Sequence, residues 1–204
     1  MTSIPTNIVP DAEEAPVLIS GRAVLEVAIL LLILMLSARA LLQTYTVSDR
    51  AMTPTIAEKQ TLVISRLTFQ LRPPQRGELV LVNESGALER KIVRRVIGLP
   101  GDVIELRGER TGIEGVQIAV NGRPLIEPYV AAQLQNSTVV SVTARIELNS
   151  DEFYVMNDNR AVPGDSRIWG PIHRENLAGR AWLAVLPLDE LRVIDHNAVR
   201  IAGE

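Results

Sequence analysis

The chain beyond residue 60 consists of short runs rich in valine and isoleucine, separated by turn residues. Asn121-Gly122 is a strong tight-turn signal because both residues tolerate positive φ. Parallel βαβ units need a helix between consecutive strands, and these gaps leave hardly any room for one. The pattern therefore predicts an antiparallel, mostly β domain with long loops. The expected strands are Thr61 to Ile64, Glu78 to Val82, Lys91 to Ile97, Asp102 to Leu106, Val116 to Val120, Val139 to Ile146 and Phe153 to Met156.

An apolar run without a charge precedes this region, from Val27 to Ala38. A membrane span needs roughly 17–25 apolar residues, so this run alone is too short. Extended over 24–42, it reaches spanning length by admitting Glu26 and Arg39 near its ends, where long side chains can reach the interface. We therefore predict an N-terminal transmembrane helix over 24–42.

A cleavable signal peptide is the rival interpretation, because Ala38-Arg39-Ala40 resembles a cleavage site. The region before the run is acidic, whereas a signal peptide starts with positive charge, so an uncleaved anchor is favoured. Proline and acidic residues predict a disordered tail over 1–23. The β domain is expected over 43–196 and a C-terminal tail over 197–204. Counting basic residues on the two sides does not decide the orientation.

Charge and composition exclude several classes of protein. The net charge is −3 and the arginines are dispersed, so nucleic acid is not expected as a partner. The absence of cysteine removes disulfides and thiolate nucleophiles. His173 and His196 are far apart and lack metal-ligand spacing, so we expect ordinary surface histidines, no metal site and no cofactor.

A series of short motifs follows the apolar run along the chain. The motifs are Met52-Thr53-Pro54-Thr55-Ile56, Arg76 to Val80, Arg95 to Asp102, Val120 to Leu125, Glu127-Pro128-Tyr129, Asp158-Asn159-Arg160, Asp165-Ser166-Arg167 and Trp169 to Ile172. Each motif is weak alone, but their order and spacing from Val24 to Ile194 are specific. Together they resemble bacterial type I signal peptidases, the membrane-anchored serine endopeptidases that remove signal peptides from secreted preproteins.

The resemblance implies a single-pass protein of the plasma membrane, with a signal-peptidase-type β domain on the extracytoplasmic face. It places a substrate groove at Met52, Pro54 and Thr55. It also implies structural ion pairs, although the same charges are compatible with a solvated loop. The implied pairs join Asp158 to Arg95, and Asp165 to Arg160 or Arg167.

The family cuts with a serine just before the Met-x-Pro element and a lysine just before the arginine that corresponds to Arg95. Here these positions hold Ala51 and Arg94. Alanine has no nucleophilic atom. A lysine becomes a base when burial lowers its pKa, whereas a guanidinium stays protonated. The resemblance therefore predicts a degenerate dyad, with the side chains of Ala51 and Arg94 facing each other.

Three further positions depart from the family. A serine that hydrogen-bonds the lysine is replaced by Pro163, which has neither a hydroxyl nor a backbone N–H. The glycine before Asp158 is replaced by Asn157. Asp49 brings negative charge close to where an oxyanion should form. These losses predict a catalytically inactive homologue that binds membrane lipid and either a signal peptide, a preprotein or an active paralogue.

The alternative is an active endopeptidase with a displaced nucleophile and base. The candidates are Ser48 or Thr53, with Lys91 as base. In extended strands, Ser48 and Lys91 would point to the faces opposite those of the residues they must replace. Thr53 would share a face with Ala51 but lie roughly 6–7 Å along the strand.

Overall fold

The computed structural model describes residues 20–84, 90–107, 117–130, 142–196 and 199–203. Most of the expected tail over 1–23 lies outside these ranges. The chain divides into two compact units, Met1–Ala38 and Arg39–Glu204.

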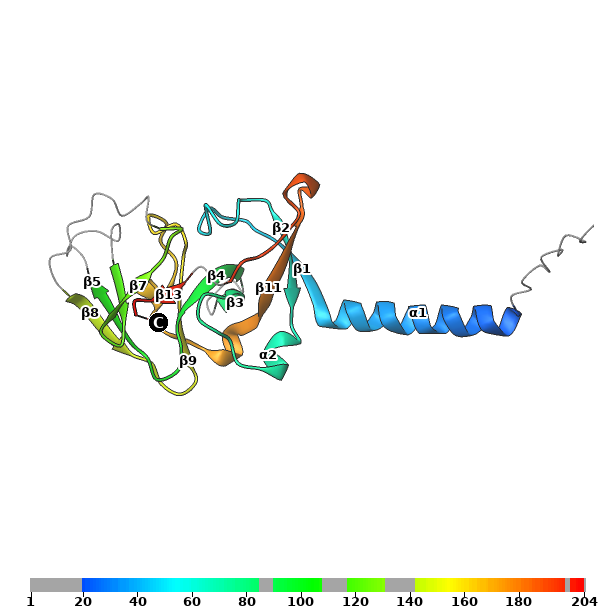
Figure 1. The fold of residues 1–204 in the computed structure, drawn as a ribbon, viewed down its shortest axis with the longest axis horizontal. Helices are drawn as coiled ribbons and strands as arrows, with labels where there is room; N and C mark the ends of the chain where they lie inside the picture. Colours follow the sequence, from blue (N-terminus) through cyan, green and yellow to red (C-terminus); the bar gives the residue numbers. More distant parts are fainter. Residues whose placement is uncertain (1–19, 85–89, 108–116, 131–141, 197–198, 204) are drawn as a thin grey trace, which may run out of the picture. The chain divides into compact units, whose positions relative to one another are not determined.

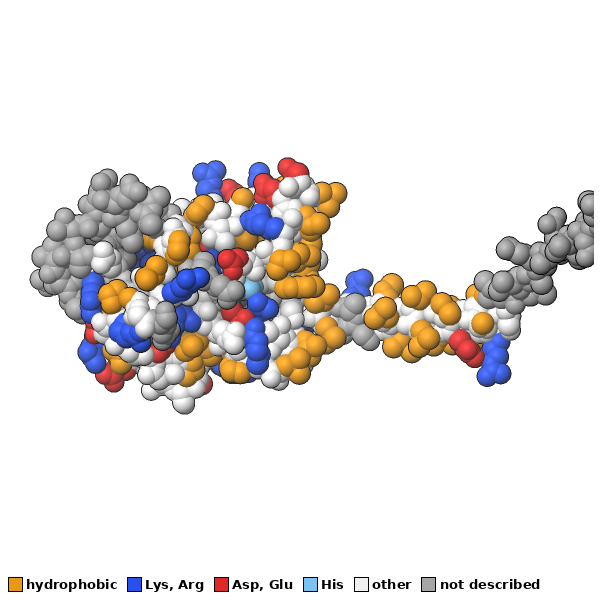
Figure 2. All heavy atoms as spheres, in the orientation of Figure 1, with side chains coloured by type: hydrophobic (Ala, Val, Ile, Leu, Met, Phe, Trp, Pro, Cys, Tyr) orange, Lys and Arg blue, Asp and Glu red, His pale blue; other side chains and the backbone are white. Residues whose placement is uncertain are grey.

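Helix α1 (Gly21–Leu41) contains the apolar run. Apolar side chains from Val24 to Leu36 are 47–66% exposed, and Figure 2 shows them along the visible face of the helix. Over the described residues, no helix meets the length and apolarity that a membrane crossing requires. The helix ends one residue before the expected boundary of 42, because Leu42 already pairs with Ser65 in a sheet.

The larger sheet of the second unit is antiparallel throughout, as the turn-separated runs predicted (Figure 1). Its strand order is β1-β2-β11-β3-β4-β9-β10, and β12 pairs with β11 outside this path. The strands are β1 (Leu42–Thr46), β2 (Thr61–Ser65), β3 (Leu79–Glu84), β4 (Arg90–Gly98), β9 (Glu152–Met156), β10 (Ile172–His173), β11 (Leu177–Leu186) and β12 (Arg192–Val193).

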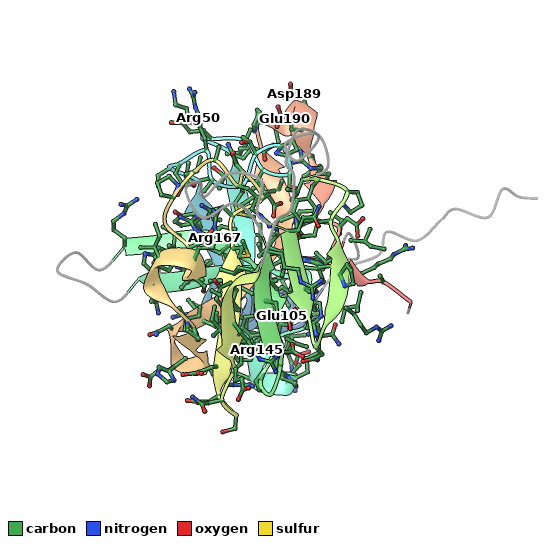
Figure 3. The ribbon with its side chains drawn as sticks, turned by 90° about the vertical axis from the view of Figure 1, so that its left-hand side faces the viewer. Arg50, Glu105, Arg145, Arg167, Asp189 and Glu190 are labelled. Carbon is green, nitrogen blue, oxygen red and sulfur yellow. The ribbon has the colours of Figure 1, made fainter. Side chains whose placement is uncertain are left out.

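The smaller sheet has the order β13-β7-β6-β5-β8 and is also antiparallel. Asn121 and Gly122 form its tight turn with φ of 54° and 79°. Figure 3 shows Glu105 and Arg145, which make an ion pair across this sheet. The strands are β5 (Val103–Arg107), β6 (Gln117–Val120), β7 (Arg123–Ile126), β8 (Val142–Glu147) and β13 (Arg200–Ile201).

The segment expected as a tail over 197–204 includes β13. Arg200 and Ile201 pair with Ile126 and Leu125 of β7, and Ile201 is buried. This segment is ordered as a strand because Ile201 packs into the apolar cluster that contains Ile104 and Val120. Residues 197, 198 and 204 lie outside the described part.

Strand β4 has alternating side chains that enter different apolar clusters. Ile92 and Val96 pack with Phe153 on one face. On the other face, Val93 belongs to a cluster around Leu62 and Ile97 belongs to the cluster beneath the smaller sheet. Because β4 is buried on both faces, it is a rigid support for Arg94 and Arg95, which lie in its middle.

Single-turn helices connect the strands. They are α2 (Thr68–Leu71), α4 (Ser166–Trp169), η1 (Arg174–Asn176) and η2 (Leu188–Glu190). Asp165 caps α4 by accepting a hydrogen bond from the Arg167 backbone N–H, which fixes the loop that runs from β9 to the candidate site.

Candidate active site

The floor of the candidate site is an ion pair between Arg95 and Asp158. Arg95 Nε and Nη2 lie 2.7 and 2.6 Å from the two carboxylate oxygens, and both side chains are fully buried. Arg95 also donates to the Gly77 carbonyl and lies over the Tyr129 ring. Burial is the largest single influence and lowers the pKa of Arg95, but the hydrogen bond to Asp158 and the negative charges of Asp158 and Glu127 together outweigh it, so the arginine pKa is raised.

The loop after Asp158 is fixed by a second ion pair. Asp165 accepts from Arg167 at 2.7 Å, and its carboxylate also accepts the Asn157 backbone N–H at 3.0 Å. Arg160 pairs with Glu127 instead of Asp165. The resemblance left the partner of Asp165 open between Arg160 and Arg167, and the structure places Arg167 there.

The Met52 element is a turn and not an extended strand. The Ile56 N–H donates to the Met52 carbonyl at 2.8 Å, and the Thr53 N–H donates to the Arg50 carbonyl at 3.3 Å. The strand alternation assumed for residues 48–53 is therefore wrong, because turn hydrogen bonds replace the extended backbone. Ala51 and Met52 are fully buried, whereas Pro54 is exposed.

Arg94 is almost fully buried and surrounded by acceptors. Its Nε donates to the Gly164 carbonyl at 2.9 Å, and its Nη1 donates to the Val93 carbonyl at 2.6 Å. Its guanidinium carbon lies 5.9 Å from the centre of the Trp169 ring. Burial lowers the pKa of Arg94, and the charge of Asp49 acts against that shift.

Asp49 joins the two positions of the expected dyad. Its Oδ2 accepts from Nη1 and Nη2 of Arg94, each at 3.3 Å, and its Oδ1 accepts the Ala51 backbone N–H at 3.1 Å. The structure therefore brings residues 49, 51 and 94 together around one carboxylate. The sequence analysis predicted that the negative charge of Asp49 lies close to the dyad positions, but it did not identify Arg94 as the partner of this charge.

The other substituted positions support the same loop. Asn157 donates from Nδ2 to the Val162 carbonyl at 2.7 Å and to the Pro163 carbonyl at 3.3 Å. Pro163 itself is exposed, and its neighbour Gly164 supplies the carbonyl that receives Arg94. These two residues thus hold the backbone that orients the guanidinium.

The candidates for a displaced nucleophile and base are Ser48, Thr53 and Lys91, and their surroundings differ from those of Ala51 and Arg94. Ser48 and Lys91 are exposed, and Lys91 is the second residue of β4, at the exposed end of the strand. The Thr53 hydroxyl donates to the Arg50 carbonyl and accepts from Asn159. In the described ranges, no hydrogen bond connects the Lys91 amine to either hydroxyl.

One edge of β4 is only partly paired. The Val96 N–H donates to the Glu78 carbonyl on the β3 side, so alternate residues Lys91, Val93 and Arg95 direct their backbone groups to the other edge. Strand β9 pairs with this edge from Arg95 onward. Within the described part of the chain, no strand pairs with it at Lys91 and Val93.

Side chains already contact this unpaired edge. The Tyr45 hydroxyl donates to the Lys91 carbonyl at 2.6 Å, and Arg94 donates to the Val93 carbonyl. Sequence reasoning missed Tyr45, because nothing in the motif pattern connects β1 with β4. Each carbonyl has a second lone pair, and the backbone N–H groups of Lys91 and Val93 face the same edge.

The family model described as signal peptidase, peptidase S26, matches residues 20–186. The chain belongs to this family. A probable signal peptidase I-2 of Synechocystis is 31% identical over 163 residues, which cover 78% of this chain and 69% of the relative. The signal peptidase I of Leptolyngbya laminosa is 28% identical over 152 residues, covering 71% of this chain and 69% of the relative.

A solved signal peptidase I from Enterococcus faecalis is 24% identical and has a TM-score of 0.42. It covers 53% of this chain and 97% of the solved chain. In this chain, the ordered motifs of the sequence include Arg95, Asp158 and the Met52 turn. The antiparallel sheets hold these three segments, which are far apart in the sequence, in one place.

Proposed function

We propose that this chain is a catalytically inactive signal peptidase homologue that binds signal peptides or preproteins without cutting them. The observation that carries the proposal is the arrangement at residues 49, 51 and 94. Ala51 offers no nucleophile, and the Arg94 guanidinium cannot take a proton. Its donors are also engaged by Asp49, Gly164 and Val93.

The proposed binding mode is addition of an extended peptide to the edge of β4 at Lys91 and Val93, which no described strand pairs with. Backbone groups of Lys91 and Val93 would pair with the peptide, as in other cases of strand addition. The adjacent turn, with Met52 buried below it and Pro54 and Thr55 at its rim, would form one wall of the groove.

A substitution pair tests this binding mode. Lys91→Pro removes one outward N–H but leaves the ladder to β3 intact, whereas Lys91→Ala keeps that N–H. With a fluorescent signal peptide and the full chain, we expect Lys91→Pro to weaken binding several-fold and Lys91→Ala to change it little. Equal affinities in the two variants would exclude strand addition at this edge.

We propose membrane attachment through the region 24–42, with the β domain on the extracytoplasmic face. The support is the exposed apolar surface of α1, which water solvates poorly (Figure 2). The chain should stay with membranes during alkaline carbonate extraction. Release of the intact chain, or a mature N-terminus near Leu41, would contradict an uncleaved anchor.

A further inference from the structure

Asp49 occupies a small receptor for a carboxylate. Three N–H donors surround its two oxygens: Nη1 and Nη2 of Arg94 at 3.3 Å and the Ala51 backbone N–H at 3.1 Å. Arginine paired with a backbone N–H is a typical arrangement for recognition of carboxylates. Here the carboxylate that fills the receptor comes from the chain itself.

The donor side of the receptor is buried, whereas its occupant is partly exposed. The Arg94 side chain is 4% exposed and is fixed by Gly164, Val93 and the Trp169 ring. The Asp49 side chain is 27% exposed, and its neighbours Ser48 and Arg50 are exposed as well. An external carboxylate could therefore displace Asp49 while the donors stay in place.

The position of the receptor defines the ligand. The resemblance assigns residues 51 and 94 to the nucleophile and base, which stand beside the bond that the family cuts. An uncut preprotein presents a neutral peptide group there. A signal peptide that has already been released ends at this point with a charged carboxylate, which is the group that the three donors match.

We infer that the site binds peptides through a free C-terminal carboxylate, and that Asp49 is the internal occupant which such a peptide displaces. The ligand class is an extended peptide ending at a cleaved bond, such as a released signal peptide. The inference rests on the proposed function, because it specifies which peptide the β4 edge receives.

The test compares two synthetic signal peptides that are identical except at the C-terminus, one a free acid and the other an amide. Binding to the full chain in detergent is measured by fluorescence anisotropy. Since hydrogen bonds to a charged group stabilise more than neutral ones, we expect the acid to bind roughly 10- to 100-fold more tightly. Higher salt should reduce this difference.

Substitutions identify the groups responsible. Asp49→Asn removes the competing charge and should increase affinity for the acid but not for the amide. Arg94→Met should abolish the preference for the acid. Arg50→Met is the matched control, because Arg50 is an exposed neighbour (Figure 3) whose side chain pairs with Glu58, and this variant should keep the preference. Thermal unfolding of each variant reports whether it is folded. Arg94→Lys is a second variant that keeps the positive charge, and its preference for the acid over the amide should be reduced.

Equal binding of the acid and the amide would overturn the inference and leave peptide binding intact. If neither peptide binds, the proposed function fails together with the inference. Unchanged affinity for the acid in Asp49→Asn would overturn the role of Asp49 as the displaced occupant.

Discussion

At the residue scale, the substituted positions form a connected set. Arg94 is larger than the expected lysine, and its charge is balanced by Asp49. Asp49 in turn accepts the Ala51 N–H, so the departures at 49, 51 and 94 are compatible with each other. Changing Asp49 or Arg94 alone removes the charge partner of the other, whereas Ala51→Ser keeps the backbone N–H but adds a hydroxyl without a base, so restoration requires several substitutions together.

The buried pair of Arg95 and Asp158 is expected to dominate the stability of the site. Asp158→Ala leaves a fully buried guanidinium without its carboxylate, so the free energy of unfolding should fall by about 3–5 kcal/mol. Glu26→Ala, which breaks an exposed pair with Arg22, is the control and should cost less than about 1 kcal/mol. Urea denaturation of both variants measures the difference, and equal costs would contradict this account.

His196 is partly buried, contrary to the expected surface position, and its Nδ1 accepts the Leu79 N–H. Burial, followed by the charge of Arg180, lowers the His196 pKa to about 4 from an ordinary value of 6.5. Between these values the unfolded chain binds more protons than the folded one. Stability should therefore fall as pH drops from about 6.5 to about 4.

The size of this effect is about 1–2 kcal/mol after allowance for the partial exposure of the imidazole. His196→Asn keeps an acceptor for Leu79 but does not titrate in this range, so its urea midpoint should change less between pH 7 and pH 5. The same pH dependence in both proteins would show that His196 is not the responsible group.

At the element scale, β11 organises the larger sheet, because it pairs with β2, β3 and β12. Gly179 allows the close approach to β2: a Cβ at this position would lie 2.7 Å from Ile64 Cγ2 and 2.8 Å from the Ser65 carbonyl oxygen. The strand therefore depends on a residue without a side chain.

Gly179→Ala should destabilise the chain by about 1–3 kcal/mol, since backbone must move to admit the methyl group. Gly122→Ala is a useful comparison, because its added Cβ meets nothing within 4 Å and the cost comes from positive φ alone, about 1–2 kcal/mol. Peptide binding should fall in Gly179→Ala and persist in Gly122→Ala. Preserved binding in both would show that β11 does not support the site.

The sequence predicted seven strands by valine and isoleucine content, and these correspond to β2, β3, β4, β5, β6, β8 and β9. The expected strand residues 116 and 139–141 lie outside the described part of the chain. The prediction missed β11, because Leu177 to Leu186 is rich in alanine and leucine and carries Arg180, a composition that favours helix over strand. It also missed β1, since the apolar run continues into Leu42. Within the site, the motifs located Arg95 and Asp158, but the pairing of Asp49 with Arg94 depends on a turn that strand alternation does not predict.

At the scale of the whole molecule, residues 39–204 form one unit with two antiparallel sheets. Both sheets contribute side chains to one buried apolar cluster, for example Ile97 from the larger sheet and Ile104 from the smaller one. The site draws on three segments around residues 49–55, 94–95 and 157–167, so only the complete domain assembles it. The family membership is shown by the match over residues 20–186. We propose that this assembled domain does not cleave preproteins.

A preprotein cleavage assay with the membrane-inserted full chain tests that claim most directly. The unmodified chain, Ala51→Ser and Arg94→Lys should each show no cleavage, since loss of nucleophile or base costs on the order of a million-fold in a serine protease. Weak cleavage should appear when both are combined, and should improve with Pro163→Ser and Asp49→Gly. Cleavage by the unmodified chain that is lost on mutation of Ser48, Thr53 or Lys91 would contradict the account.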